Sequence, residues 1–165
     1  MSELKPLPAS AVESALEKAR HYRLLNEPAE AESICLDILE IEPRHDGALV
    51  TLVLALSDQL DGAPGAFEAA RRVIPRLASE YERAYYEGIL FERRAKALLR
   101  GQSPGSGPLA YHHLEEALAR FEQAQGLAPA GSSDAILRWN ACVRLIGSRR
   151  DLRPPHADSF RPLLE

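Results

Sequence analysis

Apolar positions recur along the chain at the three- and four-residue spacing of amphipathic helices, and this spacing predicts seven helices. Their expected ranges are about 10–25, 28–41, 46–60, 66–75, 80–100, 109–126 and 133–147. Helix-favouring Ala, Leu, Glu and Arg are abundant, and runs of β-branched residues are nearly absent. The pattern therefore predicts an all-α fold.

Local start and stop signals mark where these helices should begin and end. Two capping-box patterns, a capping aspartate and a first-turn proline are the start signals: Ser10 with Glu13, Ser79 with Glu82, Asp46, and Pro28. The stretch 101–108 is expected to be a flexible loop, because glycine, serine and proline dominate it. The helices on either side of this loop should form a long hairpin.

Two series of positions repeat along the chain with the same steps. The first series consists of residues that are followed three positions later by a bulky residue, or in the last case by Cys142. Its members are Ala19, Val53, Gly88 and Trp139. Small residues form the second series: Ala31, Ala66 and Ala117. The first series advances by 34, 35 and 51 residues and the second by 35 and 51. Two helix faces thus keep one register, with an insertion between residues 88 and 117.

This register resembles the tetratricopeptide repeat, a helix pair with a period of about 34 residues. The residues that carry the resemblance are Ala19, Tyr22, Ala31, Cys35 and Pro43 in the first unit, and Gly88, Phe91, Ala117, Phe121, Ala124 and Pro129 in the third. The middle unit departs from the pattern at Val53 and Ala70, and Trp139 replaces the small residue of the fourth. The resemblance covers about residues 11–147. It implies a right-handed α-superhelical stack of helix-turn-helix repeats with an elongated third pair.

The expected organisation has three parts. A flexible lead (1–9) precedes the repeat domain (10–147), whose units are about 10–45, 46–78 and 79–131 with a terminal helix at 132–147. A basic, proline-containing tail (148–165) follows, with Phe160, Leu163 and Leu164 as apolar anchors. Either this tail is disordered, or it folds back or binds another copy of the chain through those anchors.

Charge and composition narrow the class of function. The formal net charge of −4 argues against general nucleic-acid binding. The basic tail could supply contacts to phosphates, so nucleic-acid binding is kept as a third option for function. An apolar run of membrane-spanning length, about 20 residues, is absent from the sequence. The first ten residues lack the pattern of a secretory signal, and Cys35 and Cys142 are expected to be buried free thiols. A cytoplasmic location is therefore expected.

The resemblance also implies where a partner would bind, because the first helix of each pair lines the concave face of such stacks. The partner-binding candidates on these helices are Leu16, Arg20, Arg23, Val50, Leu54, Asp58, Tyr85, Ile89, Glu92, Lys96, Ile136, Asn140 and Arg144. They predict an apolar floor with basic ends, which suits an amphipathic helix or an extended peptide. Arginines and Asn140 could hold a carboxylate. Alternatively, the apolar floor packs against neighbouring helices or the chain's own tail.

Signals for catalysis are weak. His112 and Glu116 share a helical face, but a metal site needs three or four converging ligands; both histidines of the His112–His113 pair are expected on the surface. The charges around Glu92 and Lys96 are expected to form a solvated face with ordinary ion pairs. We therefore predict no catalytic residue, no metal and no cofactor.

The sequence as a whole predicts a non-catalytic protein–protein interaction scaffold or adaptor that binds a peptide or helix of a partner protein. The alternative is a structural homo-oligomer in which the C-terminal tail docks into a neighbouring copy.

Overall fold

The computed structural model describes residues 2–152, and these residues form helices and turns without a strand. The α-helices are α1 (Val12–Leu24), α2 (Pro28–Ile41), α3 (Asp46–Asp58), α4 (Ala66–Val73), α5 (Glu80–Gly101), α6 (Ser106–Leu127) and α7 (Asp134–Ser148). Three short 3-10 turns accompany them: η1 (Ala9–Ala11), η2 (Ile74–Arg76) and η3 (Arg150–Leu152). The predicted all-α fold is confirmed.

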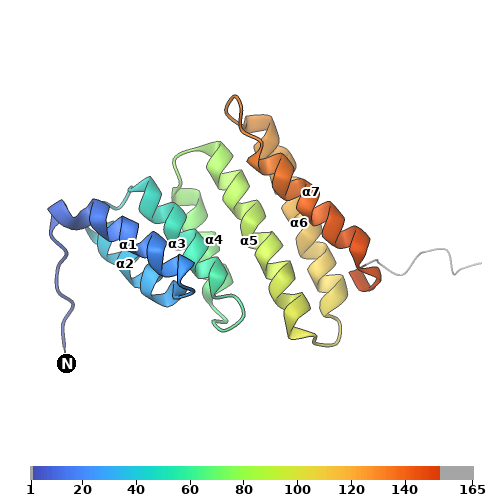
Figure 1. Cartoon of the computed structure of the whole chain (residues 1–165), viewed down its shortest axis with the longest axis horizontal. Helices are drawn as coiled ribbons and strands as arrows, with labels where there is room; N and C mark the ends of the chain where they lie inside the picture. The colour runs from blue at the N-terminus through green and yellow to red at the C-terminus, as the bar shows by residue number, and fades with distance from the viewer. Residues whose placement is uncertain (1, 153–165) are drawn as a thin grey trace, which may run out of the picture.

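The helices lie in a row from α1 and α2 at one end to α6 and α7 at the other (Figure 1). Helices that follow one another in the chain pack together, as α1 does on α2, α2 on α3, α3 on α4, α5 on α6 and α6 on α7. Each odd-numbered helix also contacts the next odd-numbered helix. Side chains from α1, α3, α5 and α7 are therefore brought side by side.

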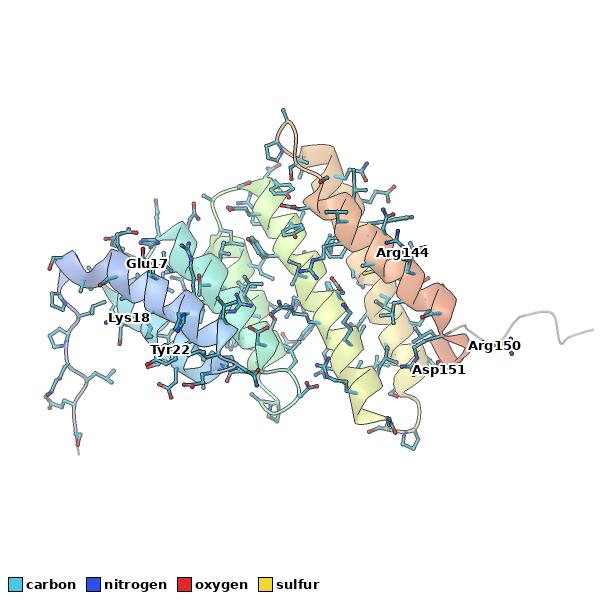
Figure 2. All side chains as sticks on the ribbon, viewed as in Figure 1. Glu17, Lys18, Tyr22, Arg144, Arg150 and Asp151 are labelled. Atoms are coloured by element: carbon cyan, nitrogen blue, oxygen red, sulfur yellow. The ribbon has the colours of Figure 1, made fainter. Side chains whose placement is uncertain are left out.

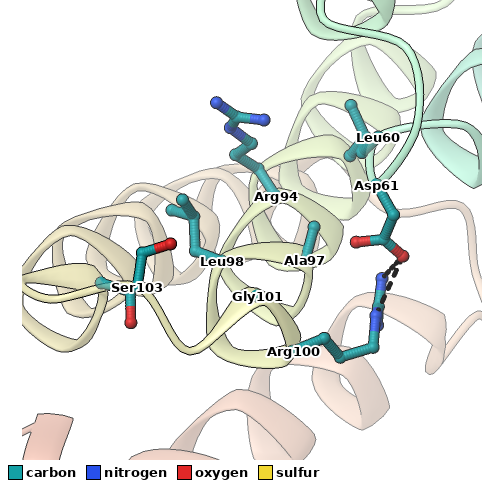
Figure 3. Close-up of a pocket in the computed structure, with 9 residues that line it drawn as sticks. Leu60, Asp61, Arg94, Ala97, Leu98, Arg100, Gly101 and Ser103 are labelled. Atoms are coloured by element: carbon teal, nitrogen blue, oxygen red, sulfur yellow. Dashed lines mark hydrogen bonds and ion pairs between the residues drawn. The ribbon is translucent and has the colours of Figure 1, made fainter.

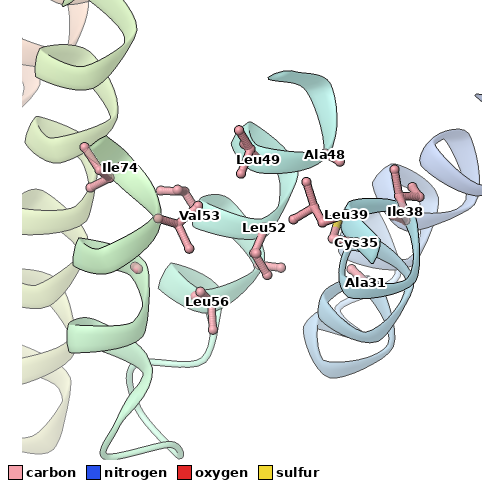
Figure 4. Close-up of a cluster of buried hydrophobic side chains, with 14 of the residues drawn as sticks. Ala31, Cys35, Ile38, Leu39, Ala48, Leu49, Leu52, Val53, Leu56 and Ile74 are labelled. Carbon is pink, nitrogen blue, oxygen red and sulfur yellow. The ribbon is translucent and has the colours of Figure 1, made fainter. Parts of the chain in front are cut away.

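Two main apolar clusters hold this row together. The first is built mainly by α1 to α4, and Figure 4 shows its centre around Cys35, Leu49 and Leu52. The second is built by α5, α6 and α7 around Leu114 and Phe121. Phe67 and Tyr86 pack against both clusters and so join the two halves.

Small residues allow the close helix contacts that the repeat pattern predicts. Ala19, Ala31 and Ala117 are fully buried. At Gly88 a Cβ atom would lie 2.7 Å from Cε1 of Phe121, so α5 and α6 approach as closely as they do because glycine occupies this position. The pairing of a small residue on one helix with a bulky residue on the other is confirmed here.

The helix boundaries confirm some start signals and correct others. Ser79 caps α5 by accepting a 3.3 Å hydrogen bond from the Glu82 N–H, and Pro28 occupies the first turn of α2. The prediction for Ser10 was wrong, because Ser10 lies in η1 and α1 begins at Val12. The prediction for Asp46 was also wrong.

His45 caps α3 in place of Asp46. Its Nδ1 accepts a 3.3 Å hydrogen bond from the Ala48 N–H. Asp46 is already the first residue of the helix, one position too late to cap it. Its carboxylate instead accepts a 3.2 Å hydrogen bond from the Ala78 N–H, which ties the start of α3 to the segment that leads into α5.

The third helix pair is elongated as predicted, with 22 residues in each of α5 and α6. The loop between them is shorter than predicted, because α6 begins at Ser106 and only residues 102–105 connect the two helices. Gln102 and Gly105 adopt left-handed conformations, with φ of 49° and 80°, and so reverse the chain within four residues.

Packing continues beyond Gly147, where the repeat domain was expected to end. Leu152 is fully buried in the second cluster. Asp151 lies so close to α6 that a Cβ on Gly107 would come within 2.6 Å of its carbonyl oxygen. Leu152 of the predicted tail therefore belongs to the core. The predicted anchors Phe160, Leu163 and Leu164 lie outside the described residues.

Both cysteines are free and buried, as predicted. Burial raises the pKa of the Cys35 thiol to about 12 and that of the Cys142 thiol to about 12. Because the thiolate is the reactive form, both side chains act as small apolar residues of the core.

Candidate functional site

The residues that were predicted to form an open apolar floor are largely packed in the interior of the protein. Leu16 and Ile89 are each 3 % exposed and belong to the two core clusters. Val50 and Leu54 are half-buried and pack against the same clusters. The reason is that α1 contacts α3 and α3 contacts α5, so the apolar stripe of each helix is covered by a neighbouring helix. The alternative interpretation of the floor as internal packing applies to these four residues.

The other predicted residues divide between packing and open surface. Tyr85 is half-buried and stacks on Tyr81 with ring centroids 5.7 Å apart, and burial raises the pKa of its phenol. Arg20 and Arg144 are exposed, and Figure 2 shows Arg144 on α7. Ile136 is exposed and Asn140 half-buried on the same helix. None of these residues lines the cleft that the structure reveals.

A polar cleft of about 430 Å³ opens where the odd-numbered helices lie side by side. Charged and polar side chains line it: Arg23, Asn26, Ser57, Asp58, Asp61, Arg93, Lys96, Arg100 and Arg138. Of the predicted binding residues, Arg23, Asp58 and Lys96 belong to this set. We call it the basic cleft, because five of its side chains are cationic and two are carboxylates.

Asp58 binds two arginines at one end of the basic cleft. It accepts a 2.8 Å hydrogen bond from Arg23 Nε on α1, and it pairs with Arg93 on α5. Arg93 also donates to Ser57 Oγ at 2.6 Å. Burial lowers the pKa of Arg93, and the Asp58 carboxylate opposes this shift. One carboxylate of α3 thus holds a cation from each of its two neighbouring helices.

Glu92 forms a second centre beneath the basic cleft. Its side chain is 1 % exposed, and it pairs with Lys96 and, at 3.4 Å, with Nη1 of Arg138 on α7. The predicted Glu92–Lys96 pair is confirmed, but Glu92 is buried and not on a solvated face. Burial lowers the pKa of Arg138, but Glu92 and Tyr85 outweigh it and the pKa is raised overall.

Arg100 and Asp61 form a third, more open pair at the rim. Arg100 donates to Asp61 Oδ2 from Nε at 3.0 Å and from Nη2 at 2.6 Å. Both residues also line a second pocket of about 380 Å³, which Figure 3 shows. In that pocket Arg94 lies over the Phe67 ring, 5.6 Å from its centroid, so its cation is held by an aromatic face.

Sequence reasoning missed six residues of the basic cleft: Asn26, Ser57, Asp61, Arg93, Arg100 and Arg138. For α5 a signal was present, because Arg93, Lys96 and Arg100 recur at the spacing of one helical face. The partners of these cations are far away in sequence, and Arg93 lies 35 positions after Asp58. Their pairing depends on how the helices stack, which the sequence pattern does not specify.

The remaining candidate chemistry lies outside the basic cleft. His113 was expected on the surface but is half-buried between Phe67 and Phe91, with ring centroids 5.8 Å from each. Within residues 2–152, no three His, Cys, Asp or Glu side chains are grouped so that they could hold a metal ion. None of the described helices combines the length and apolar character needed to cross a membrane.

Comparisons of the chain with protein-family models, with curated proteins and with solved structures give no match. Any function assigned to this chain therefore rests on its own residues, and the basic cleft is the strongest feature they offer.

Proposed function

We propose that this protein is a non-catalytic scaffold that binds a segment of a partner protein in its basic cleft. The observation that carries the proposal is that α1, α3, α5 and α7 all contribute to a single polar cleft. Three of these helices, α1, α5 and α7, supply arginines to it, and arginine is favoured where proteins bind one another. Within this proposal the helices form a right-handed stack of tetratricopeptide-like pairs, and the protein is cytoplasmic.

The packing order of the helices supports this proposal. In stacked helix pairs each unit contacts only its neighbours, and the first helices line one continuous surface. Here each odd-numbered helix contacts the next one, and α2, α4 and α6 pack against their partners in the pairs. A cleft built from several repeats suits an extended or helical segment better than a compact small molecule.

Photo-crosslinking in a native lysate tests the proposal. A benzoyl-phenylalanine at position 100 replaces a cleft residue whose side chain is 60 % exposed. The matched control carries the same group at Lys18, which is exposed on α1 and outside the basic cleft (Figure 2). We expect mass spectrometry to find one partner segment linked from position 100 and not from position 18. Identical products from both positions, or no product from position 100, would contradict a binding role for the cleft.

A further inference from the structure

The ion pairs of the basic cleft are unbalanced in a regular way. Among the described residues, two cations share one carboxylate at Asp58, where Arg23 and Arg93 meet. Two cations also share one carboxylate at Glu92, where Lys96 and Arg138 meet. The Arg100–Asp61 pair is balanced. Each of the two shared centres therefore carries one positive charge in excess, and the basic cleft as a whole carries two.

The two centres take cations from neighbouring positions on α5. Arg93 of the first centre and Lys96 of the second are three residues apart on α5. Residues with this spacing are surface neighbours on a helix, with roughly 5–6 Å between their Cβ atoms. Both side chains line the same cleft. A ligand that neutralises both centres must therefore present two negative groups about one helical turn apart.

The centres also show which negative group they accept. At each one, a carboxylate of the chain already lies within ion-pair distance of both cations. The side chains of Arg23 and Arg93 are 19 % and 24 % exposed, and those of Lys96 and Arg138 are 42 % and 38 % exposed. The cations are therefore partly shielded from solvent, which strengthens an ion pair, and yet a ligand can reach them.

We infer that the segment bound in the basic cleft carries two acidic side chains separated by about one helical turn, one for each centre. This inference rests on the proposed scaffold function and names the chemistry of its partner. Two separate carboxylates fit better than one phosphate, because a phosphate concentrates its charges at one point, whereas the excess charges belong to two centres. A nucleic acid fits less well, since the chain has a net charge of −4.

Selection from a random library of twelve-residue peptides, displayed on phage, tests this inference with the purified full chain. We expect the enriched peptides to carry two Asp or Glu residues three or four positions apart. Replacing either one by its amide in a synthetic copy should weaken binding roughly tenfold, the effect of one charge-assisted hydrogen bond. The Arg23→Gln and Lys96→Gln variants each remove one cation from one centre. Each should select peptides with a single acidic residue, and the Lys18→Gln control should select the same peptides as the wild type.

The outcomes separate the inference from the function on which it rests. Enriched peptides that bind in the cleft but lack the acidic pair would overturn the inference and leave the scaffold proposal in place. Enrichment of phosphate-mimicking clusters of adjacent acidic residues, unaffected by the single variants, would also overturn it. Failure to enrich any peptide, together with no crosslink from position 100, would overturn both.

Discussion

Gly88 shows how much a single methyl group matters at the contact between α5 and α6. We expect Gly88→Ala to lower the free energy of unfolding by about 1–3 kcal/mol, because the new Cβ would overlap the ring of Phe121. Gly126→Ala is the matched control. Gly126 is also helical, and a Cβ added there would meet no atom within 4 Å, so alanine should be neutral or slightly stabilising. Urea denaturation of both variants measures the difference, and equal stabilities would contradict the close contact.

His113 should make stability depend on pH. Burial lowers its pKa, Arg94 and His112 lower it further, and Glu116 opposes them. Because the folded-state pKa lies below the ordinary value of about 6.5, the unfolded chain binds the proton more readily. The contribution of His113 is therefore complete above about pH 6.5 and is lost as the pH falls toward the folded-state pKa.

Thermal unfolding between pH 7.5 and pH 5.5 measures this effect. We expect the wild type to lose more stability over this range than His113→Gln, which cannot be protonated. His21→Gln, a change at an exposed histidine on α1, should behave like the wild type. If all three proteins lose the same stability, the half-buried position of His113 has no influence on the pH dependence.

At the scale of the helix, two serines occur in the same capping-box sequence pattern, but only Ser79 caps a helix in the structure. We expect Ser79→Ala to cost about 1 kcal/mol, since Ser79 Oγ satisfies the Glu82 N–H at the start of α5. Ser10→Ala changes the same residue type in the same sequence motif, but Ser10 lies within the 3-10 turn η1 and is not the N-cap of α1. Its cost should stay within about 0.5 kcal/mol. Urea denaturation of the two variants checks the ranking, and a larger loss for Ser10→Ala would contradict it.

The elements themselves could be predicted because their signals are local. Apolar spacing, Pro28 and the Ser79 capping box lie inside or next to the helices that they define. The shortened loop between α5 and α6 could not be predicted, because it depends on the left-handed conformation of Gln102. The cap of α3 was assigned to the wrong residue because the Asp46 carboxylate accepts a hydrogen bond from the Ala78 N–H, 32 residues away.

The binding surface of the whole molecule was harder to predict than its elements. The first helices of the expected pairs line the cleft, but only three of its nine lining side chains were predicted: Arg23, Asp58 and Lys96. Leu16 and Ile89 were expected in an open floor and are buried, because neighbouring odd-numbered helices cover them. Arg138 was missed because its partner Glu92 lies 46 residues earlier on another helix. If the packing register between two helices shifts by one residue, such ion pairs change while each helix stays the same.

Cooperativity between the two halves of the molecule should depend on Phe67. Its ring packs against both apolar clusters and lies 5.8 Å, between ring centroids, from Phe91. In stacked helical units, stability is a sum of the units and the interfaces between neighbours. Weakening this interface lets one half unfold before the other, which broadens the transition and lowers the apparent m-value.

Phe67→Ala should therefore lower both the midpoint and the apparent m-value of urea unfolding. Phe121→Ala is the matched control, because Phe121 is fully buried within the second cluster. We expect Phe121→Ala to lower the free energy of unfolding by about 3–5 kcal/mol and so to lower the midpoint. Its m-value should change less than that of Phe67→Ala. Hydrogen exchange measured on Phe67→Ala should then show different protection in α1–α4 and in α5–α7. If the unfolding transition of Phe67→Ala stays as sharp as that of the wild type, residues other than Phe67 couple the two halves. Tyr86 would then be the first residue to test, because it also packs against both clusters.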